Sequence, residues 1–399
     1  MNSNLPNDSA QVASQKIFAA RWIVPVVSEP IQGGWIRIHG NRIVEIQQGK
    51  PPKPAIDLGD VAILPGLVNS HTHLEFSDCP QPIGAPGVPL ATWIGQVIGA
   101  RSATTAQSKQ AAIANGLQQS VAVGVRLIGE ITTPPCDYPE SEIDIVGFAE
   151  VVGLSESRWR DRLQAATDHN ERFTSAGWSP HAPYSTSRQA IEACVKRSAA
   201  IGRPLAMHVA ESPAERELLC GGTGPFADSL RSIGVWQDGV FPWGDDPIVG
   251  LIKTLSDAPQ VLLVHCNDLR KSEIDAVAMH SNLTVVYCPR THAFFGYDRH
   301  PVAEMLRAGI PIAIGTDSRA SNPDLNLWSE VQYLLNNRMD ISPHDVLKMA
   351  TFHGANGLGR PDKGRLAVDA KPGLGIVETN ADTIDALFRD MAGNAYRPK

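Results

Sequence analysis

The sequence predicts an α/β fold in which a parallel (β/α)8 barrel of the TIM type follows a small β unit. From Pro65 onward, short apolar runs alternate with longer helix-like segments, and eight of the runs have the length of a strand. Before that point, from residue 16 to 62, the runs are strand-like and separated by turn residues such as Gly40-Asn41. At 399 residues the chain is long enough for one barrel and one small additional unit.

The expected elements follow one another in a regular order after Pro65. Helix-like segments stand between the runs, for example at residues 187–200 and 301–309. The tail at residues 363–377 returns to strand-like sequence, which we expect to rejoin the N-terminal unit. Residues 1–15 are polar, and we expect a flexible N-terminus there. The eight expected barrel strands are the run that ends at His71 and residues 125–131, 144–152, 176–182, 204–210, 260–267, 283–289 and 311–317.

Composition and charge exclude several classes of protein. Hydrophobic residues make up 43% of the chain and charged residues 19%, which is enough apolar material for a large core. The net charge of −7 gives no electrostatic support for binding nucleic acid or an anionic membrane. No apolar stretch reaches the ~18 residues of a membrane span. The six cysteines include no CxxC pair, as is typical of reduced thiols. We therefore expect a soluble, cytoplasmic protein.

Histidines and one aspartate stand at the carboxyl ends of four expected strands. His71 and His73 are separated by one residue, so on a strand both imidazoles point to the same face. His208, His265 and Asp317 end the fifth, sixth and eighth strands. Because all strands of such a barrel end at one mouth, these side chains should converge there. Imidazoles with a carboxylate suit an ion such as Zn²⁺, which lowers the pKa of bound water from ~15.7 toward ~7.

Two other residues are expected at the same mouth. Glu211 follows the histidine of the fifth strand by three residues, where a carboxyl group could carry a proton without binding the metal. His181 ends the fourth strand. Taken alone, any one histidine of the chain is more often a core or surface residue, so the interpretation depends on the joint pattern.

The positions of the lysines indicate one metal ion rather than two. No lysine lies between Lys109 and Lys196, which covers the second, third and fourth strand ends, so none is present there to bridge a pair of ions. Glu130 and Glu150 end the second and third strands and could hold a second ion. Structural roles near the barrel interior are the stronger interpretation for both.

The motifs that contain these residues resemble those of a known family. PGLVNSHTH, SPHAPYS, MHVAES, LVHCND, IGTDS and ATFHGANGLG occur in this order. Together they resemble the amidohydrolase superfamily, and within it the mononuclear-metal branch of cytosine, guanine, adenosine and S-adenosylhomocysteine deaminases and triazine chlorohydrolases. The resemblance covers the chain from about residue 16 to the C-terminus. It implies a small β-sandwich domain built from both chain ends, residues 16–62 and 357–399, beside a metal-dependent hydrolase barrel at 63–356.

The resemblance also implies a role for each residue at the mouth. One divalent metal ion per chain, Zn²⁺ or as a second choice Fe²⁺, is bound by the counterparts of His71, His73, His208 and Asp317. The counterpart of His265 contacts the hydrolytic water, and that of Glu211 shuttles the proton. Metal-activated water then attacks an electron-poor ring carbon, with Asp317 or Glu211 as the base and Glu211 protonating the adjacent ring nitrogen. Ammonia is released, while His265 helps to stabilise the developing negative charge.

Four residues are expected to contact the substrate. Trp93 resembles a tryptophan that stacks on the purine in nucleoside deaminases, although an apolar helix contact explains it equally well. His181 resembles a substrate contact of the same group. Arg290 and His292 occupy an aromatic-flanked basic loop after the seventh strand, which suggests a substrate with a carboxylate or phosphate. Aminodeoxyfutalosine, whose benzoate would suit Arg290, is one such substrate.

The sequence therefore predicts a metal-dependent hydrolase of carbon–nitrogen bonds other than peptide bonds, namely a deaminase of an aminated purine, nucleoside or related heterocycle. Three alternatives stay open. The same site could open a cyclic amide, as imidazolonepropionase does, or dechlorinate a triazine, or belong to a non-catalytic protein that binds a metabolite. We expect a small-molecule substrate, no nucleic-acid or membrane partner, and, by analogy with the relatives, a homo-oligomer.

Overall fold

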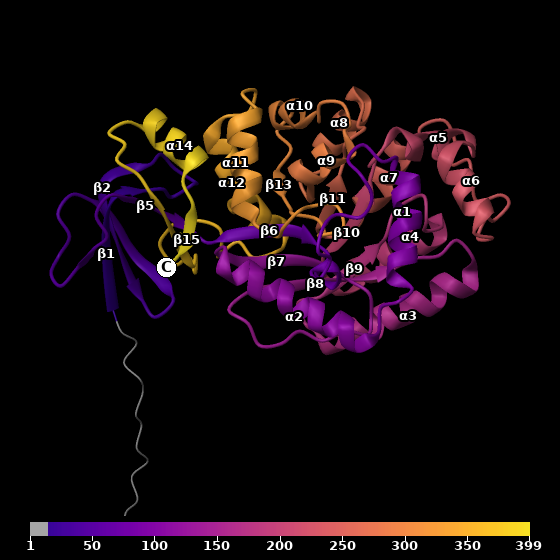
Figure 1. Ribbon diagram of the computed structural model, residues 1–399, viewed down its shortest axis with the longest axis horizontal. Coiled ribbons are helices and arrows are strands. Elements are labelled where there is room, and N and C mark those ends of the chain that lie inside the picture. Colours follow the sequence, from indigo (N-terminus) through magenta and orange to yellow (C-terminus); the bar gives the residue numbers. More distant parts are fainter. Residues whose placement is uncertain (1–14) are drawn as a thin grey trace, which may run out of the picture.

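The computed structural model describes residues 15–399, so the segment expected to be a flexible N-terminus lies, apart from Gln15, outside the described residues. The described chain forms a seven-stranded sheet and an eight-stranded parallel barrel, which lie side by side (Figure 1). The predicted α/β barrel with a separate sheet from both chain ends is confirmed. The domain limits at residues 62/63 and 356/357 stay a prediction.

The separate sheet combines strands from the beginning and the end of the chain. Its strand order is β15-β14-β5-β1-β2-β3, and β4 pairs with β1 in addition. In Figure 1 the C-terminal strands therefore lie next to the N-terminal ones. The strands of this sheet are β1 (Gln15–Ile23), β2 (Ile31–His39), β3 (Arg42–Gln48), β4 (Ile56–Asp57), β5 (Val61–Pro65), β14 (Leu374–Glu378) and β15 (Tyr396–Pro398).

Tyr396 in β15 fastens the chain end to the start of the barrel. Its hydroxyl donates to the carbonyl oxygen of Pro65 over 2.9 Å, and its side chain is buried. The ring lies so close to Gly124 and Gly375 that a Cβ atom on either glycine would be 2.2 Å or less from it. Only glycine leaves room for the tyrosine at these two positions. The tyrosine thereby ties β15 to the end of β5 and to the residue just before the barrel strand that begins at Val125.

The tail differs from the sequence prediction in two ways. The strand-like sequence at 363–377 forms a strand only from Leu374, and the residues before it are turns and loop. After β14 the chain forms the helix α14 (Ile384–Gly393), capped by the Thr383 hydroxyl, and then β15, neither of which was predicted. The Gly-Leu-Gly sequence at 373–375 does not prevent the strand, because β14 pairs with β5 from Leu374 to Glu378.

The barrel consists of eight parallel strands in sequential order. The first is joined to the end of the last by a bridge between Thr72 and Asp317, and Asp317 N donates to the carbonyl oxygen of His71 over 3.1 Å. A Cβ on Gly315 would lie 2.6 Å from that same carbonyl oxygen, so a glycine is needed where the two strands meet. The barrel strands are β6 (Leu67–Thr72), β7 (Val125–Thr132), β8 (Asp144–Val151), β9 (Gly177–Pro180), β10 (Leu205–Val209), β11 (Val261–His265), β12 (Leu283–Tyr287) and β13 (Ile312–Ile314).

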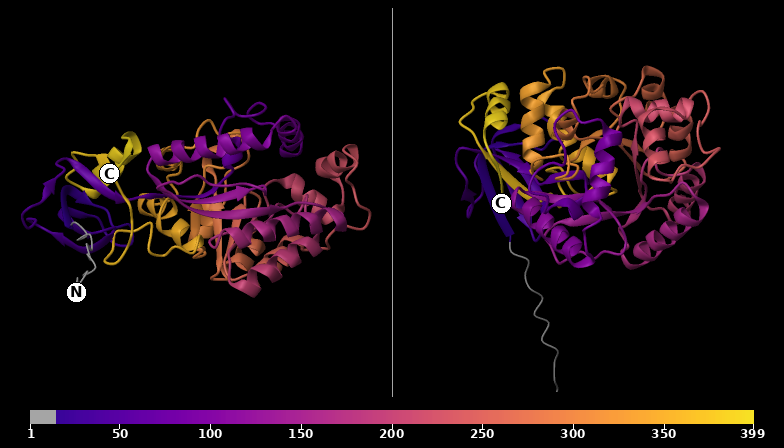
Figure 2. Two further views of the ribbon diagram at one scale, coloured as in Figure 1. Left: turned by 90° about the horizontal axis from the view of Figure 1, so that it is seen from below. Right: turned by 45° about the vertical axis from the view of Figure 1, so that its right-hand side comes forward.

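Helices surround the barrel (Figure 2). Several begin at a capping side chain; for example, the hydroxyl of Ser187 accepts from Ala190 N at the start of α4. The helices are the 3-10 turn η1 (Leu74–Phe76) and α1 (Leu90–Arg101), α2 (Ala106–Ala122), α3 (Glu156–Arg172), α4 (Arg188–Ile201), α5 (Pro213–Gly221), α6 (Gly224–Ser232), α7 (Pro247–Leu255), α8 (Lys271–Ala278), α9 (Pro289–Phe295), α10 (Val302–Arg307), α11 (Leu327–Asn337), α12 (Pro343–Met349) and α13 (Phe352–Gly357).

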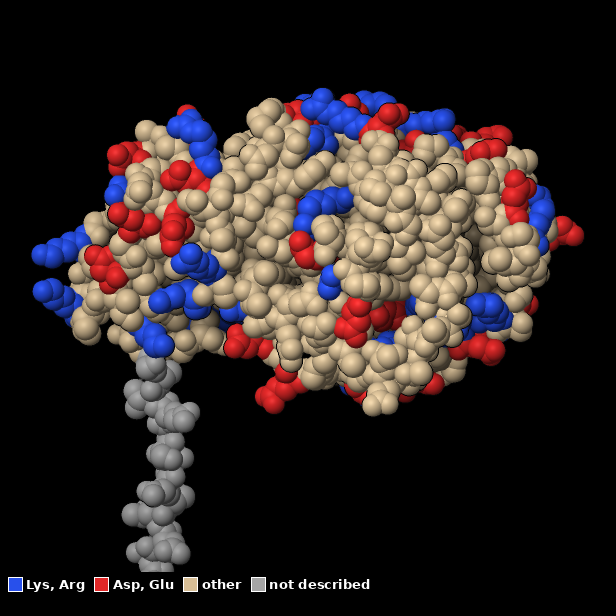
Figure 3. Space-filling view, in the orientation of Figure 1, with Lys and Arg blue, Asp and Glu red and all other residues tan. Residues whose placement is uncertain are grey.

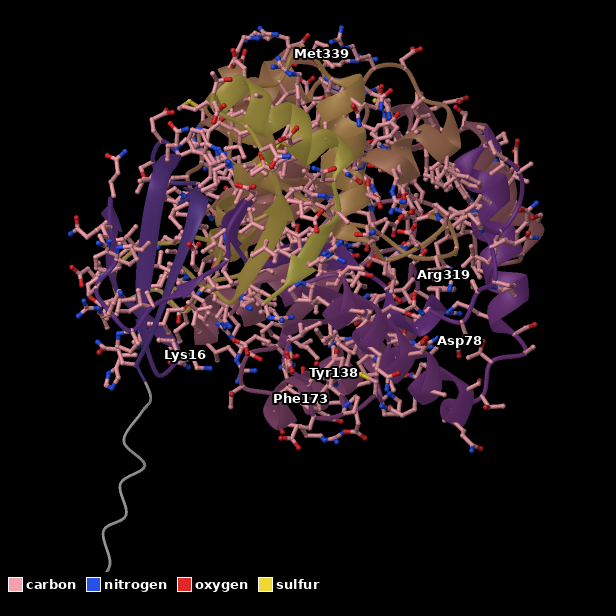
Figure 4. The ribbon with its side chains drawn as sticks, turned by 60° about the vertical axis from the view of Figure 1, so that its left-hand side comes forward. Lys16, Asp78, Tyr138, Phe173, Arg319 and Met339 are labelled. Atoms are coloured by element: carbon pink, nitrogen blue, oxygen red, sulfur yellow. The ribbon has the colours of Figure 1, made fainter. Side chains whose placement is uncertain are left out.

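A compact apolar cluster fills the barrel interior. Leu127, Phe148, Leu262 and Val264 belong to it, with Leu358 packed against them from the segment after α13. A second, larger cluster lies between the strands and the surrounding helices. At the end of α3, Phe173 packs edge-on against Tyr138 from the β7–β8 connection, with ring centroids 5.5 Å apart (Figure 4). The polar side chains described next lie at the mouth, beyond this apolar floor.

No helix among residues 15–399 is long and apolar enough to cross a membrane. Lysine, arginine, aspartate and glutamate side chains are interspersed over the face shown in Figure 3. Such a distribution is typical of a mixed surface without a large field of one sign.

Candidate active site

Imidazoles from three strands meet at the mouth of the barrel. The ring centroid of His71 lies 4.9 Å from that of His73, 5.0 Å from that of His208 and 5.7 Å from that of His265. His71, His208 and His265 are buried, whereas His73 is partly exposed to the cavity above. The convergence expected from the strand ends is therefore present.

The potential ligand atoms form two overlapping groups. One comprises His71, His208 and His265, the other His71, His73 and Asp317, and within each group these atoms lie within 4.8 Å of one another. Oδ1 of Asp317 is 3.5 Å from Nε2 of His71 and 3.7 Å from Nε2 of His73. Nitrogens of four imidazoles and one carboxylate oxygen thus face a common space.

Left-handed backbone conformations set the direction of several side chains at the mouth. His265 has a φ of 72° and Asp317 a φ of 55°, and Ala210, just after β10, has a φ of 49°. Along β11 the side chains of Leu262 and Val264 belong to the cluster inside the barrel, so simple alternation would turn His265 away from it. Each left-handed residue that is not glycine costs about 1–2 kcal/mol, and such strain is concentrated at functional sites.

Hydrogen bonds behind the cluster fix its orientation. Nδ1 of His208 donates to the carbonyl oxygen of His181 over 2.7 Å, which leaves Nε2 of His208 toward the cluster. The Ser321 hydroxyl donates to Oδ2 of Asp317 over 2.9 Å, and it also lies 3.1 Å from the hydroxyl of Thr291. Ser321 therefore holds one carboxylate oxygen while the other faces the imidazoles.

The loop that follows Asp317 is tied to the loop that follows β6. Arg319 donates to the carbonyl oxygens of Ser77 and Pro80, which places its side chain across that loop (Figure 4). Glu130 accepts from the backbone N–H of Leu74 at 3.0 Å and is fully buried. Glu130 thus supports the turn after His73 and does not face the cluster as a ligand.

The imidazoles are neutral at ordinary pH. Burial, followed by the neighbouring histidines, lowers the pKa of His71 well below its usual value, and burial lowers the pKa of His208 to about 4. Both ring nitrogens of His71 and Nε2 of His265 are buried without a hydrogen-bond partner among residues 15–399. Neutral imidazoles with unpaired nitrogens are the state that a metal ion requires. The residues present therefore fit a divalent metal.

Glu211 lies beside this cluster, and its pKa is raised, whereas the pKa values of the histidines are lowered. Its Oε1 is 3.4 Å from Nε2 of His265, and its Oε2 accepts from the hydroxyl of Tyr184 over 3.1 Å. Burial first, and then the negative charge of Asp317, raise the pKa of Glu211 well above its usual value. The buried carboxylate of Glu215 accepts from the backbone N–H groups of Ala210 and Glu211, which holds the segment that carries Glu211 in place.

A cavity of about 750 Å³ opens above the cluster. Its walls include Trp93 and His181, which the sequence indicated, together with His73, Glu211 and Asp317. Trp93 is anchored by a hydrogen bond from Nε1 to the carbonyl oxygen of Ala320 and packs edge-on against Phe295. The structure therefore brings seven of the ten predicted site residues to this cavity, while His71 lies buried beneath; the seven are His73, Trp93, His181, His208, Glu211, His265 and Asp317.

Arg290 and His292 are not among the residues that line the cavity. The guanidinium of Arg290 pairs with Glu330 at 2.7 Å and with Asp324 at 2.6 Å, so its donors are used within the protein. Glu330 is fully buried and requires this cation. His292 is buried against Tyr287, with ring centroids 5.7 Å apart. The expectation that both contact the substrate therefore finds no support in these contacts, because Arg290 is paired within the protein and His292 packs against a buried tyrosine.

Several cavity residues were not singled out from the sequence. Tyr184 lies within the SPHAPYS motif, where its contact with Glu211 could not be read from spacing. Arg158 and Arg162 come from successive turns of α3 and line the cavity. Their spacing of four residues was the available signal, because it places both on one face of a helix.

Comparison with known proteins identifies the family. The model of the amidohydrolase family matches residues 62–395. The chain belongs to the amidohydrolase family. This amidohydrolase is a hydrolase of carbon–nitrogen bonds, and the family implies a divalent metal ion, which the cluster around His71 fits.

The amidohydrolase is similar to known deaminases over most of its length. It is 26% identical to 5-methylthioadenosine/S-adenosylhomocysteine deaminase of Nitratidesulfovibrio vulgaris, over 92% of this chain and 84% of the relative. It is 26% identical to aminodeoxyfutalosine deaminase of Deinococcus radiodurans, over 77% and 76%. The crystal structure of Helicobacter pylori aminofutalosine deaminase superimposes with a TM-score of 0.82 at 20% identity, covering 96% of this chain and 97% of that one. These relatives fit the mononuclear-metal branch of the family.

Proposed function

We propose that this amidohydrolase is a hydrolytic deaminase of an aminated purine nucleoside, which it converts with activated water and release of ammonia. The observation that carries the proposal is the carboxyl group of Glu211, 3.4 Å from His265 at the floor of a deep cavity, with its pKa raised well above the usual value. A carboxyl group of this kind can be protonated near neutral pH and can deliver a proton to a ring nitrogen.

The proposed metal ligands are His71, His73, His208 and Asp317. Neutral imidazoles and one carboxylate are the donor set that Zn²⁺ prefers in hydrolases, with Fe²⁺ as the alternative. When bound there, the ion lowers the pKa of a water molecule toward ~7 and so supplies the nucleophile at neutral pH. Nε2 of His265 is the remaining imidazole nitrogen of the cluster, and we assign it to the hydrolytic water and the developing charge.

The side chains around the cluster divide the proton transfers between them. Asp317, held at Oδ2 by Ser321, takes the proton of the attacking water at its other oxygen. Glu211 protonates the ring nitrogen beside the carbon under attack, which makes that carbon more electrophilic. The C–N bond to the exocyclic amine then breaks, a proton passes to the leaving nitrogen, and ammonia departs. The hydroxyl of Tyr184 keeps Glu211 directed toward the reacting atoms throughout.

The size and charge of the cavity support a substrate larger than a free base. A volume of about 750 Å³ exceeds the space that a bicyclic base alone would fill. Arg158 and Arg162 line it and have no ion-pair partner among residues 15–399. Unpaired guanidinium groups bind carboxylates well. We therefore propose that these two arginines, in place of Arg290, bind an anionic substituent of the substrate. S-adenosylhomocysteine and aminodeoxyfutalosine each carry a carboxylate that could bind there.

The test is ammonia release by the zinc-loaded protein from a panel of amines. The panel contains adenosine, 5-methylthioadenosine, S-adenosylhomocysteine, aminodeoxyfutalosine, guanine, cytosine and an aminotriazine. We expect the protein to release ammonia from a nucleoside and Asp317→Asn to release none. Arg158→Gln should turn over the nucleosides that carry a carboxylate more slowly than the unaltered protein does. Ammonia from no compound, with the metal shown to be bound, would refute the proposal. Ring-opened acid from a cyclic amide or chloride from a chlorotriazine would then identify the alternative reaction, and tight binding without turnover would indicate a non-catalytic protein.

A further inference from the structure

Glu150 is a buried carboxylate without a hydrogen bond. It ends β8, its side chain is 9% exposed, and it lines the cavity. Among residues 15–399 no backbone or side-chain group donates a hydrogen bond to it. The other buried carboxylates of the described chain all accept at least one such bond; they are Glu130, Glu211, Glu215, Glu273, Asp317 and Glu330. A carboxylate is costly to bury without donors, so its donors must come from the cavity.

His181 provides a second polar atom that faces the same space. Its Nε2 lies 4.0 Å from Oε1 of Glu150, and its Nδ1 lies 2.6 Å from the hydroxyl of Ser185. A separation of 4.0 Å is too long for a direct hydrogen bond, but one oxygen atom can lie about 2.8 Å from both atoms. A hydroxyl group fits this position because it donates to the carboxylate and can still accept from a ring N–H.

The position of this pair distinguishes it from the reacting centre. His181 borders the cluster, since its ring centroid is 5.0 Å from that of His208, whereas Glu150 comes from β8, which is one strand farther than β9 from the strand β10 that carries His208. The leaving amine and the attacked carbon must lie between Glu211, His265 and Asp317. A hydroxyl between Glu150 and His181 therefore belongs to a part of the substrate attached to the base.

We infer that Glu150 and His181 form a subsite for a pentose hydroxyl of the substrate, with Glu150 as the residue that selects a ribonucleoside over its deoxy analogues. This inference rests on the proposed function and names the part of the substrate that the subsite takes. A site built to bind a hydroxyl group discriminates strongly against an analogue that lacks it, because the polar groups are then left unpaired.

The experiment compares substrates and variants together. For the nucleoside that releases ammonia, kcat/KM is measured beside its 2′-deoxy, 3′-deoxy and 2′,3′-dideoxy analogues. We expect the protein to lose about 10- to 100-fold on the dideoxy analogue, in keeping with a hydrogen bond to a charged group. Glu150→Met has a side chain of similar length with no acceptor oxygen. Its kcat/KM on the ribonucleoside should fall by a similar factor, so that the ribonucleoside and the dideoxy analogue differ by less than about threefold. Glu150→Gln should retain part of the preference for the ribonucleoside. Glu140→Gln, an exposed glutamate of the preceding segment, is the matched control and should leave all values unchanged.

The outcomes separate this inference from the proposed function. Equal discrimination in the unaltered protein and in Glu150→Met, or no loss on the deoxy analogues, would overturn the subsite. If the protein binds two metal ions per chain and Glu150→Met binds only one, Glu150 is a ligand of a second cation and the hydroxyl subsite is overturned. Binding of inosine against 2′,3′-dideoxyinosine, measured by calorimetry, requires no turnover. If no compound releases ammonia but inosine binds more tightly than its dideoxy analogue only when Glu150 is present, the subsite stands and the deamination does not. If inosine shows no such preference either, both fall.

Discussion

Ser321→Ala tests whether the carboxylate of Asp317 has to be held from behind. The hydroxyl of Ser321 is fully buried and donates to Oδ2 of Asp317, while Oδ1 faces His71 and His73 at 3.5 and 3.7 Å. Removing the hydroxyl leaves Oδ2 without this donor and frees the carboxylate to rotate. A hydrogen bond to a charged group contributes about 1.5–3 kcal/mol, and losing a contact behind a metal ligand costs about 10- to 100-fold in metal affinity or activity.

The measurement is a zinc titration of the metal-free protein, combined with thermal unfolding and kcat. The matched control is Ser120→Ala, because Ser120 is equally buried and its hydroxyl donates to the carbonyl oxygen of Gly116 in α2, away from the mouth. Both variants should lower the melting temperature, and only Ser321→Ala should weaken zinc binding and lower kcat by at least tenfold. If zinc affinity and kcat in Ser321→Ala match those of the control, the reasoning about Asp317 is refuted.

Three further predictions concern the surroundings of the site. Arg290→Met should lower the free energy of unfolding by about 3–5 kcal/mol, since it leaves the buried Glu330 unpaired, with KM for a carboxylate-bearing nucleoside unchanged; a large rise in KM would restore Arg290 as a substrate contact. Tyr184→Phe removes the hydrogen bond that lowers the pKa of Glu211, so this pKa rises further. Because Glu211 acts in its protonated form, the alkaline limb of the kcat/KM profile, where that proton is lost, should move to higher pH. An unmoved limb would show that Glu211 does not govern it. Removing the metal with a chelator should lower the melting temperature and zinc should restore it, because the ion binds the folded chain; at 100 times its Kd a ligand stabilises by about 2.7 kcal/mol.

The sequence predicted the barrel well because the signal for each strand is local. Runs such as 125–131 and 144–152 end within one residue of β7 and β8. The last strand was predicted too long: the expected strand at 311–317 is regular only as Ile312–Ile314, since the chain must pass close to β6 at Gly315 and adopt a left-handed conformation at Asp317. Contacts between distant strands decide such an ending, and no local pattern contains them.

The convergence of the histidines and Asp317 could be predicted for a related reason. In a parallel barrel every strand end reaches the same mouth, so the position of His208 or Asp317 in the sequence is enough to place it there. Arg290 also follows a strand end, yet its side chain turns to Glu330, which is forty residues away in the sequence. Whether a charged group faces the cavity or a buried partner depends on that partner. The isolated sequence gives no sign of the pairing.

Tyr396 has a consequence for how the molecule is made. Its hydroxyl bonds to Pro65, and its strand extends the edge that β14 adds to β5. A ribosome synthesises β5 before the whole barrel and β14 and β15 after it, so one edge of β5 stays unpaired until those two strands have been made. The strand that carries His71 follows β5 directly. A nascent chain therefore carries all the histidines and the aspartate of the site before this sheet is complete, and a chain cut between α13 and β14 would keep those residues beside an unfinished sheet.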